Sequence, residues 1–253
     1  MRTDRLVITC EHGGRQVPRA YAALFQGYEP LLASHRGYDA GALLLARALA
    51  RALGAPLFGT TITRLLVDLN RSLRHPAIFS EITRGLPVAE REHIVKRYYV
   101  PHRARVQARM AELIGVGDRV IHLAVHSFTP SLDGRLRKAD AGLLYDPRRQ
   151  AEARLCRAWQ AELRIAHPGL RVRCNYPYLG RADGLTTALR RIFVPEGYLG
   201  IELEVNQIHV ATAPSHWAEF RHLIIESLQA VLALRWDGRR EAAPLSAPVS
   251  PQA

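Results

Sequence analysis

The stretch Arg5-Leu6-Val7-Ile8-Thr9-Cys10-Glu11-His12-Gly13-Gly14 sets the pattern from which the fold can be worked out. Its first six residues form a short, mainly apolar run, which is typical of a β-strand. Two glycines follow, and glycine permits the backbone conformations of a tight turn. The sequence therefore predicts a strand over 5–10, a turn after it, and His12 at the carboxyl end of the strand.

The alternation of strand and helix continues along the chain. Apolar residues at helical spacing predict a helix over 38–53 that ends at Gly54. Further strands are expected over 65–69, 120–125, 143–145, 170–174 and 198–205, and further helices over 89–114, 150–166 and 217–234. This alternation predicts an α/β fold with three layers, α/β/α, around a mixed, largely parallel central sheet. Ligands of such sheets bind outside the carboxyl ends of the strands.

Length and composition favour one folding unit. A chain of 253 residues with 48% hydrophobic residues can bury a substantial core. We expect a single domain over 1–238. Residues 239–253 are rich in proline, alanine and serine, and this composition predicts a disordered tail.

The formal net charge of +12 raises the question of nucleic-acid binding. Lys96 and Lys138 are the only lysines, and the arginines are scattered over nearly every segment. Neither a basic patch interleaved with aromatic residues nor a helix-turn-helix signature is present. We therefore expect no nucleic-acid partner, and keep a non-enzymatic protein that binds anions or nucleic acid as the alternative from another functional class.

Cysteine usage and the first residues bear on the compartment. The three cysteines are widely spaced and form no CxxC pattern, so neither a disulfide framework nor a thiolate zinc site is expected. The apolar run before Glu11 is too short for a signal sequence or a membrane span. These features predict a cytoplasmic protein without a membrane partner.

Two histidines are the best candidates for metal ligands. His12 and His126 each directly follow an apolar strand, and each precedes residues that turn the chain. Asp39, at the start of the helix over 38–53, either caps that helix or binds the metal. Glu11 competes for the carboxylate position, although neighbours in an extended segment point to opposite faces. His35 is expected farther from the metal or at the surface.

The segment Thr63-Arg64-Leu65-Leu66-Val67-Asp68-Leu69-Asn70-Arg71 places two arginines around an apolar run. Guanidinium groups in a shielded cleft bind carboxylates or stabilise an oxyanion. Asp68 can orient an arginine, and Asn70 can donate to the same carboxylate. Structural salt bridging is the alternative interpretation of this segment.

Two glutamates lie on one face of the strand over 198–205. Glu202 and Glu204 are two positions apart, so their side chains point to the same side of the sheet. A glutamate beside a metal can take a proton from water and pass it to a leaving amine. The alternative is that both residues lie on an exposed edge strand.

These segments, in this order, resemble the N-formylglutamate amidohydrolase family, which is similar in fold to zinc carboxypeptidases and aspartoacylases. The resemblance spans about residues 6–234. Its segments are Cys10-Glu11-His12-Gly13-Gly14 with Val17-Pro18, His35 to Ala42, Thr63 to Arg71, His126-Ser127-Phe128, Asp140 to Tyr145, Asn175-Tyr176-Pro177-Tyr178 with Asp183-Gly184, and Glu204-Val205-Asn206-Gln207.

The resemblance implies roles for individual residues. One Zn²⁺ per chain, or another divalent metal, would be held by His12, Asp39 and His126. Arg64 would stabilise the oxyanion, and Glu204 would act as general base and then acid. Asn70 and Arg71 would bind the substrate carboxylate, with Tyr176 or Tyr178 closing over the substrate or packing in the interior. One departure is Arg15, which stands where zinc carboxypeptidases have a ligand glutamate, three residues after the first histidine.

The function expected from this resemblance is hydrolysis of the amide C–N bond of an N-acyl amino acid. N-formyl-L-glutamate is the first candidate substrate, giving L-glutamate and formate in histidine catabolism. A carboxypeptidase-like or aspartoacylase-like amidase with another acyl group is the nearest alternative. The sequence leaves the oligomeric state open.

Overall fold

A six-stranded sheet forms the centre of the computed structural model, which describes residues 2–234. The strand order is β2-β1-β3-β8-β6-β7. Strands β2, β1, β3 and β8 are parallel, whereas β6 is antiparallel to β8 and parallel to β7. The strands are β1 (Asp4–Cys10), β2 (Leu57–Gly59), β3 (Arg119–Phe128), β6 (Ala141–Leu144), β7 (Val172–Cys174) and β8 (Tyr198–Asn206). The predicted mixed, largely parallel sheet is confirmed.

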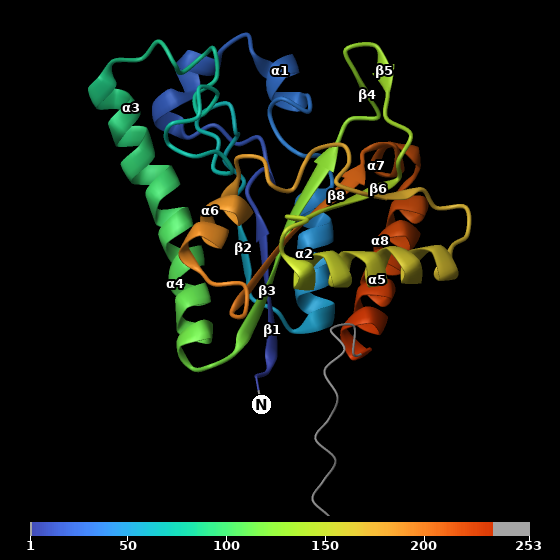
Figure 1. Ribbon diagram of the computed structural model, residues 1–253. Coiled ribbons are helices and arrows are strands. Elements are labelled where there is room, and N and C mark those ends of the chain that lie inside the picture. The colour runs from blue at the N-terminus through green and yellow to red at the C-terminus, as the bar shows by residue number, and fades with distance from the viewer. Residues whose placement is uncertain (1, 235–253) are drawn as a thin grey trace, which may run out of the picture.

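Helices cover both faces of this sheet, so the predicted three layers are also confirmed (Figure 1). One face packs on α2 (Ala42–Leu53), α5 (Gln150–Ala166) and α8 (Pro214–Ala233). The other packs on α4 (Val100–Gly115) and α6 (Leu185–Ile192). Every residue of β3 and of β8 is buried. Burial on both sides explains the runs of successive apolar residues in these strands, such as Leu123-Ala124-Val125 in β3 and Tyr198-Leu199-Gly200-Ile201 in β8.

Shorter elements connect these layers. They are the 3₁₀ helix η1 (Arg19–Phe25), α1 (Glu29–Ala33), α3 (Val88–Ile94), the π-helical turn η2 (Val95–Tyr99), the hairpin strands β4 (Ser131–Leu132) and β5 (Arg135–Leu136), and α7 (Ile208–Thr212). Helix α2 ends at Gly54, which adopts the left-handed conformation that glycine tolerates best. The predicted tail over 239–253 lies outside the described residues.

The predicted strand over 65–69 is wrong. This segment is irregular, and the second strand of the chain is instead β2, Leu57–Gly59. Leu65, Leu66, Val67 and Leu69 are buried because they form a second apolar core above the sheet. Their partners in this core include Tyr21, Phe25, Ile78, Ile82, Ile94 and Tyr99. Periodicity cannot separate a buried loop from a buried strand when the apolar run is this short.

Side chains and backbone together hold this irregular segment, which covers residues 60–87 and is called the loop segment below. The carbonyl of Leu65 accepts hydrogen bonds from Ser80 Oγ at 2.6 Å and Thr83 Oγ1 at 3.2 Å. The Tyr99 hydroxyl donates to the carbonyl of Arg71 at 2.8 Å. The loop segment is thus fixed by the second core, which it shares with neighbouring elements, and by hydrogen bonds within the segment and from Tyr99, and none of its residues belongs to a strand of the six-stranded sheet.

Within residues 2–234, no helix combines the length and the apolar character that crossing a bilayer requires.

Candidate active site and metal centre

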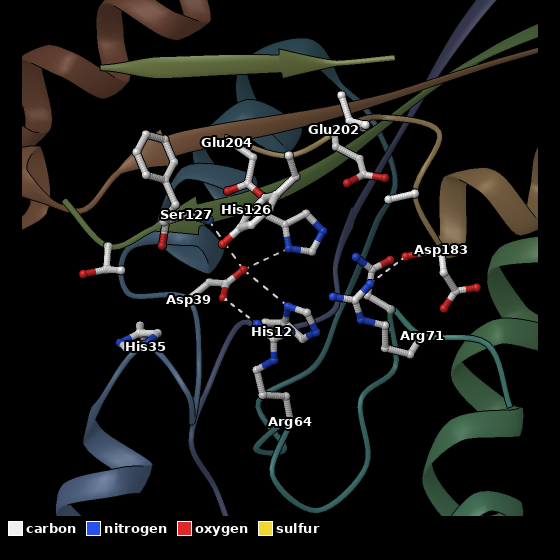
Figure 2. A pocket seen from close by; sticks show the side chains of 16 residues that line it. His12, His35, Asp39, Arg64, Arg71, His126, Ser127, Asp183, Glu202 and Glu204 are labelled. Carbon is white, nitrogen blue, oxygen red and sulfur yellow. Dashed lines mark hydrogen bonds and ion pairs between the residues drawn. The ribbon is translucent and has the colours of Figure 1, made fainter. Parts of the chain in front are cut away.

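A cavity of about 180 Å³ lies at the carboxyl ends of β1, β3 and β8 (Figure 2). The loop segment closes one side of this cavity. Its lining residues are His12, His35, Asp39, Arg64, Asn70, Arg71, His126, Ser127, Phe128, Thr129, Tyr178, Leu179, Ala182, Asp183, Glu202 and Glu204. Most of the site residues expected from the sequence therefore share one cavity.

Two imidazoles and one carboxylate converge at the floor of the cavity. Asp39 Oδ2 lies 2.9 Å from His126 Nδ1 and 3.4 Å from His12 Nδ1. The three side chains are buried, and within residues 2–234 they form the single group of three potential ligands whose donor atoms come within 4.8 Å of one another. Two nitrogens and one oxygen make a suitable donor set for a catalytic zinc ion, which leaves the fourth position open.

Local backbone structure directs Asp39 toward this point. Its side chain does not cap α2, so the capping interpretation is wrong. The Asp39 amide donates to the carbonyl of His12 at 2.9 Å, which ties the two residues together. Gly41 then starts α2 with φ of 79°, and a Cβ on Gly41 would lie 2.6 Å from a methyl group of Val210. Glycine is required at that turn by both conformation and space.

A second carboxylate lies behind each imidazole. His12 Nε2 lies 2.7 Å from Asp68 Oδ1, and His126 Nε2 lies 3.3 Å from Glu11 Oε2. With a metal at the shared point, the nitrogen of each ring that faces Asp39 would present its lone pair to the metal, and the outer nitrogen would carry the ring proton toward Asp68 or Glu11. The geometry therefore places Asp39 among the potential ligands and Glu11 behind His126, on the side away from the cavity.

Glu11 also contacts a histidine from the opposite helix layer. His102 Nε2, on α4, lies 3.5 Å from Glu11 Oε1, and both side chains are almost completely buried. Burial alone would raise the pKa of Glu11, but contacts with His102 and His126 outweigh it and hold that pKa well below its ordinary value. Glu11 is thus a buried anion between two imidazoles.

The pKa values of two carboxyl groups in the cavity, those of Asp39 and Glu204, are shifted in opposite directions. Burial would raise the pKa of Asp39, but His12 and His126 lower it below its ordinary value. Burial raises the pKa of Glu204 to about 8, because the opposing effect of His126 is smaller. One carboxyl group is therefore held as an anion and the other binds a proton readily near neutral pH.

The two glutamates lie on an internal strand, since β8 runs between β3 and β6. The edge-strand alternative is therefore wrong. Glu202 Oε1 accepts a hydrogen bond from Thr186 Oγ1 at 2.5 Å. Glu204 Oε2 is buried and has no hydrogen-bond partner within residues 2–234. Of the two, Glu204 is the carboxyl group with an oxygen free to exchange protons in the cavity.

The loop segment supplies the cationic side of the cavity. Arg64 donates to Asp68 at 2.8 Å and lies 3.4 Å from Asp39, and this pairing raises the pKa of the guanidinium against the effect of burial. Arg71 donates to the carbonyl of Asp183 at 2.9 Å. Asn70 accepts from the Leu185 amide at 2.7 Å, so its amide nitrogen remains available as a donor.

Of the other residues singled out in the sequence, some line the cavity and some do not. Tyr178 lines the cavity and accepts a hydrogen bond from Arg137 at 3.1 Å, whereas Tyr176 does not line it and packs edge-on against Phe128. His35 lies at the rim and is exposed. Arg15, at the position of the carboxypeptidase glutamate, stacks on the ring of Tyr38.

Sequence reasoning missed several residues. Asp68 was expected to orient an arginine, as it does, but its contact with His12 was not foreseen. His102 was not singled out, although it occupies the buried face of α4 with Val106, Met110 and Leu113. A histidine at helical spacing with buried apolar residues is the signal that could have found it.

Comparison with known proteins assigns the family. The model of the N-formylglutamate amidohydrolase family matches residues 4–210. A crystal structure of a gene product from Agrobacterium tumefaciens is 31% identical, with a TM-score of 0.77 and 90% of each chain covered. The crystal structure of N-formylglutamate amidohydrolase from Ralstonia eutropha JMP134 is 21% identical, covers 92% of this chain and 94% of its own, and has a TM-score of 0.69, which shows a common fold. Among curated proteins, none matches this sequence. With the family match extending over most of the length, the chain belongs to the N-formylglutamate amidohydrolase family.

Proposed function

We propose that this protein is a zinc-dependent amidohydrolase that cleaves N-formyl-L-glutamate to L-glutamate and formate. The proposal rests on one observation: groups suited to amide hydrolysis and groups suited to carboxylate binding line the same cavity. A potential metal site and a glutamate whose pKa is about 8 lie beside two arginines suited to a carboxylate. Family membership supports an amide as the bond that is cleaved.

His12, Asp39 and His126 would hold the zinc ion. The donor set of these residues suits a zinc ion. Asp68 and Glu11 face the outer nitrogens of the two imidazole rings, as carboxylates beside metal-binding histidines usually do. When bound, the ion would polarise the formyl carbonyl and lower the pKa of a neighbouring water toward about 7.

Glu204 is the proposed proton carrier. It takes a proton from the water whose oxygen adds to the formyl carbon, and it then gives that proton to the amide nitrogen as the C–N bond breaks. A group that both accepts and returns a proton works best when its pKa lies near the working pH, as the buried position of Glu204 provides. Glu202 keeps its hydrogen bond to Thr186 and contributes negative charge to the same wall.

The loop segment is proposed to bind the substrate. Arg64, already oriented by Asp68, would face the oxygen on which negative charge develops during the addition of water. Arg71 and the free amide nitrogen of Asn70 would bind the carboxylate of the glutamate product moiety. Tyr178, at the cavity wall, would cover the bound substrate.

We place this reaction in the cytoplasm and in histidine catabolism, as proposals that rest on the family. All three cysteines are free thiols, which is compatible with a reducing compartment. A small molecule is the expected substrate partner of an amidohydrolase with a cavity of about 180 Å³.

The test is release of glutamate from N-formyl-L-glutamate by the purified protein, comparing chelator-stripped with zinc-reconstituted samples. Turnover that appears only after zinc addition supports the proposal. Binding of zinc without turnover, when N-acetyl-L-glutamate and N-formyl-L-aspartate are also tried, would keep the metal and reject the substrate. Equal turnover before and after stripping would reject the metal.

A further inference from the structure

A second cavity, of about 380 Å³, lies beside α7 and α8 and shares no lining residue with the catalytic cavity. Three of the eleven histidines of the chain gather around it. Its lining residues are Asp140, His167, Gly169, Leu170, Arg171, His209, His216, Glu219, Phe220 and Leu223. The polar ones belong to elements far apart in sequence, and α7 packs directly on α8 (Figure 1).

Two of these histidines face each other through their ring nitrogens. His209 Nδ1 lies 2.9 Å from His216 Nε2. His209 Nε2 lies 3.2 Å from Asp140 Oδ1, and the ring of His209 stacks on Phe220 with centroids 3.9 Å apart. Because Asp140 accepts the proton of Nε2, Nδ1 of His209 carries the lone pair that points at His216. The ring is thus fixed in tautomer and in plane.

A carboxylate and a third imidazole are available next to this pair. Glu219 follows His216 by three positions on α8, so the two side chains share one face of the helix. Glu219 and His167 both line the cavity, and neither makes a side-chain hydrogen bond or an ion pair within residues 2–234. The donor atoms of Glu219 and of the two facing imidazoles do not all lie within 4.8 Å of one another in this structure, so Glu219 has to turn toward the pair to share a ligand with it.

We propose that this cavity is a second zinc site, with His209, His216 and Glu219 as its protein ligands. Two nitrogens on a tetrahedral zinc ion lie about 3.3 Å apart, so the observed pair has to open by a few tenths of an ångström, and both rings have to rotate so that the facing nitrogens point at the metal instead of at each other. Asp140 holds the outer nitrogen of His209, in the way that carboxylates orient metal-binding histidines. For the metal to bind at Nε2 of His216, the proton that this nitrogen now donates to His209 moves to Nδ1 of the same ring by exchange with solvent.

Bound zinc would tie together three elements near the carboxyl end of β8. His209 lies on α7, His216 and Glu219 lie on α8, and Asp140 directly precedes β6. Zinc that binds only the folded chain raises its stability. The proposed role of this second ion is therefore to stabilise the fold, and the proposal does not depend on the function proposed for the catalytic cavity.

Zinc titration of the chelator-stripped full chain tests this inference. We expect the double variant His209→Gln/His216→Gln to bind one zinc ion fewer than the unmodified protein, and to lose the increase in Tm that zinc at that site provides. Asp140→Asn should weaken this one binding event about 10- to 100-fold without abolishing it. The catalytic cavity contributes equally to all these samples, so the difference between them isolates the second site.

His222→Gln is the matched control, because His222 pairs with Glu226 at 3.0 Å on an exposed face of the same helix, outside the cavity. It should bind as much zinc as the unmodified protein. Equal zinc binding by the double variant and the unmodified protein would overturn the inference, as would an equal loss in His222→Gln. If the double variant does not fold, Glu219→Gln at an exposed position decides: weaker binding of one zinc ion supports the inference, and unchanged zinc affinity overturns it.

Discussion

The two sides of the catalytic cavity are built in different ways. One side, the strand-borne half, consists of His12, His126, Glu202 and Glu204 at the ends of β1, β3 and β8. Its backbone is paired in a parallel ladder in which His126 lies opposite Glu204. The other side, the loop-borne half, consists of Arg64, Asp68, Asn70 and Arg71. Its backbone belongs to no sheet and rests on a second apolar core.

This difference separates the proposed chemistry from the proposed recognition. Of the groups that would hold zinc or carry protons, His126 and Glu204 sit on the fully buried strands β3 and β8, whereas His12 lies in the turn after β1 and Asp39 precedes α2. The arginines that would bind the substrate sit on the loop segment, which packs on the smaller second core. Experiments that disturb one half and leave the other intact test whether the separation is real.

The largest effect is expected in the strand-borne half. Glu204→Gln removes the proposed proton carrier and should lower kcat by about 10²- to 10⁴-fold, with zinc affinity retained. Steady-state kinetics with N-formyl-L-glutamate and a zinc titration measure the two quantities. Glu202→Gln is the control at the neighbouring position of the same strand face, and a larger loss there than at Glu204 would exchange the roles of the two residues.

A core substitution should disturb the loop-borne half selectively. Leu66 is completely buried in the second core, so Leu66→Ala should cost about 2–5 kcal/mol of stability within the loop segment. We expect higher KM and faster amide hydrogen exchange over residues 60–87, with zinc affinity unchanged. Leu155→Ala, on the buried face of α5, makes the same truncation away from the loop segment and should leave KM unchanged. Equal effects of the two substitutions on KM would show that substrate binding does not depend on the loop segment separately from the rest of the fold.

The arginine of the loop-borne half should affect binding more than turnover. Arg71→Ala removes a charged donor to the substrate carboxylate, and such contacts are worth about 1.5–3 kcal/mol. KM should therefore rise about 10- to 100-fold while kcat changes little. Arg74→Ala, exposed on the same segment and absent from the cavity, supplies the comparison. An unchanged KM in Arg71→Ala would remove the residue from substrate recognition.

The smallest expected effect is a loss of stability at low pH that arises from His122 in the central sheet. His122 on β3 is fully buried between Thr9 and Tyr198, and burial lowers its pKa to about 4. The unfolded chain, with a histidine pKa of about 6.5, takes up this proton first. The free energy of unfolding therefore falls as pH drops from about 6.5 toward 4, by about 2 kcal/mol at pH 5 from this residue.

Denaturant unfolding of the unmodified protein and of His122→Gln, each at pH 7 and pH 5, measures this contribution. The variant should lose less stability on acidification than the unmodified protein does. The same loss in both would show that other groups carry the acid sensitivity.

The strand-borne half could be predicted from the sequence because its signals are local. Apolar runs that end in a histidine or contain alternating glutamates mark strands, and parallel strands bring their carboxyl ends together. His12, His126 and Glu204 were placed at one edge of the sheet on this basis, and the structure brings them into one cavity. Their catalytic roles stay predictions.

The loop-borne half was located by its residue types but not by its conformation. The apolar run over 65–69 was taken as a strand because burial in a small separate core and burial in a sheet leave the same pattern in five residues. The contacts of Asp68 with His12 and of His102 with Glu11 join segments far apart in sequence. Such pairs depend on the packing of helix α4 and the loop segment, which no local pattern encodes.

The second apolar core has a consequence for how this enzyme family can diversify. The loop segment begins after β2, ends before α3, and carries both the cations proposed to bind the substrate and most of the buried apolar residues that keep them in place. If those cations have the proposed role, insertions and replacements within the segment would change which acid is recognised while the strands of the sheet keep their sequence. Substrate specificity would then evolve through this one segment, separately from the residues at the ends of the strands.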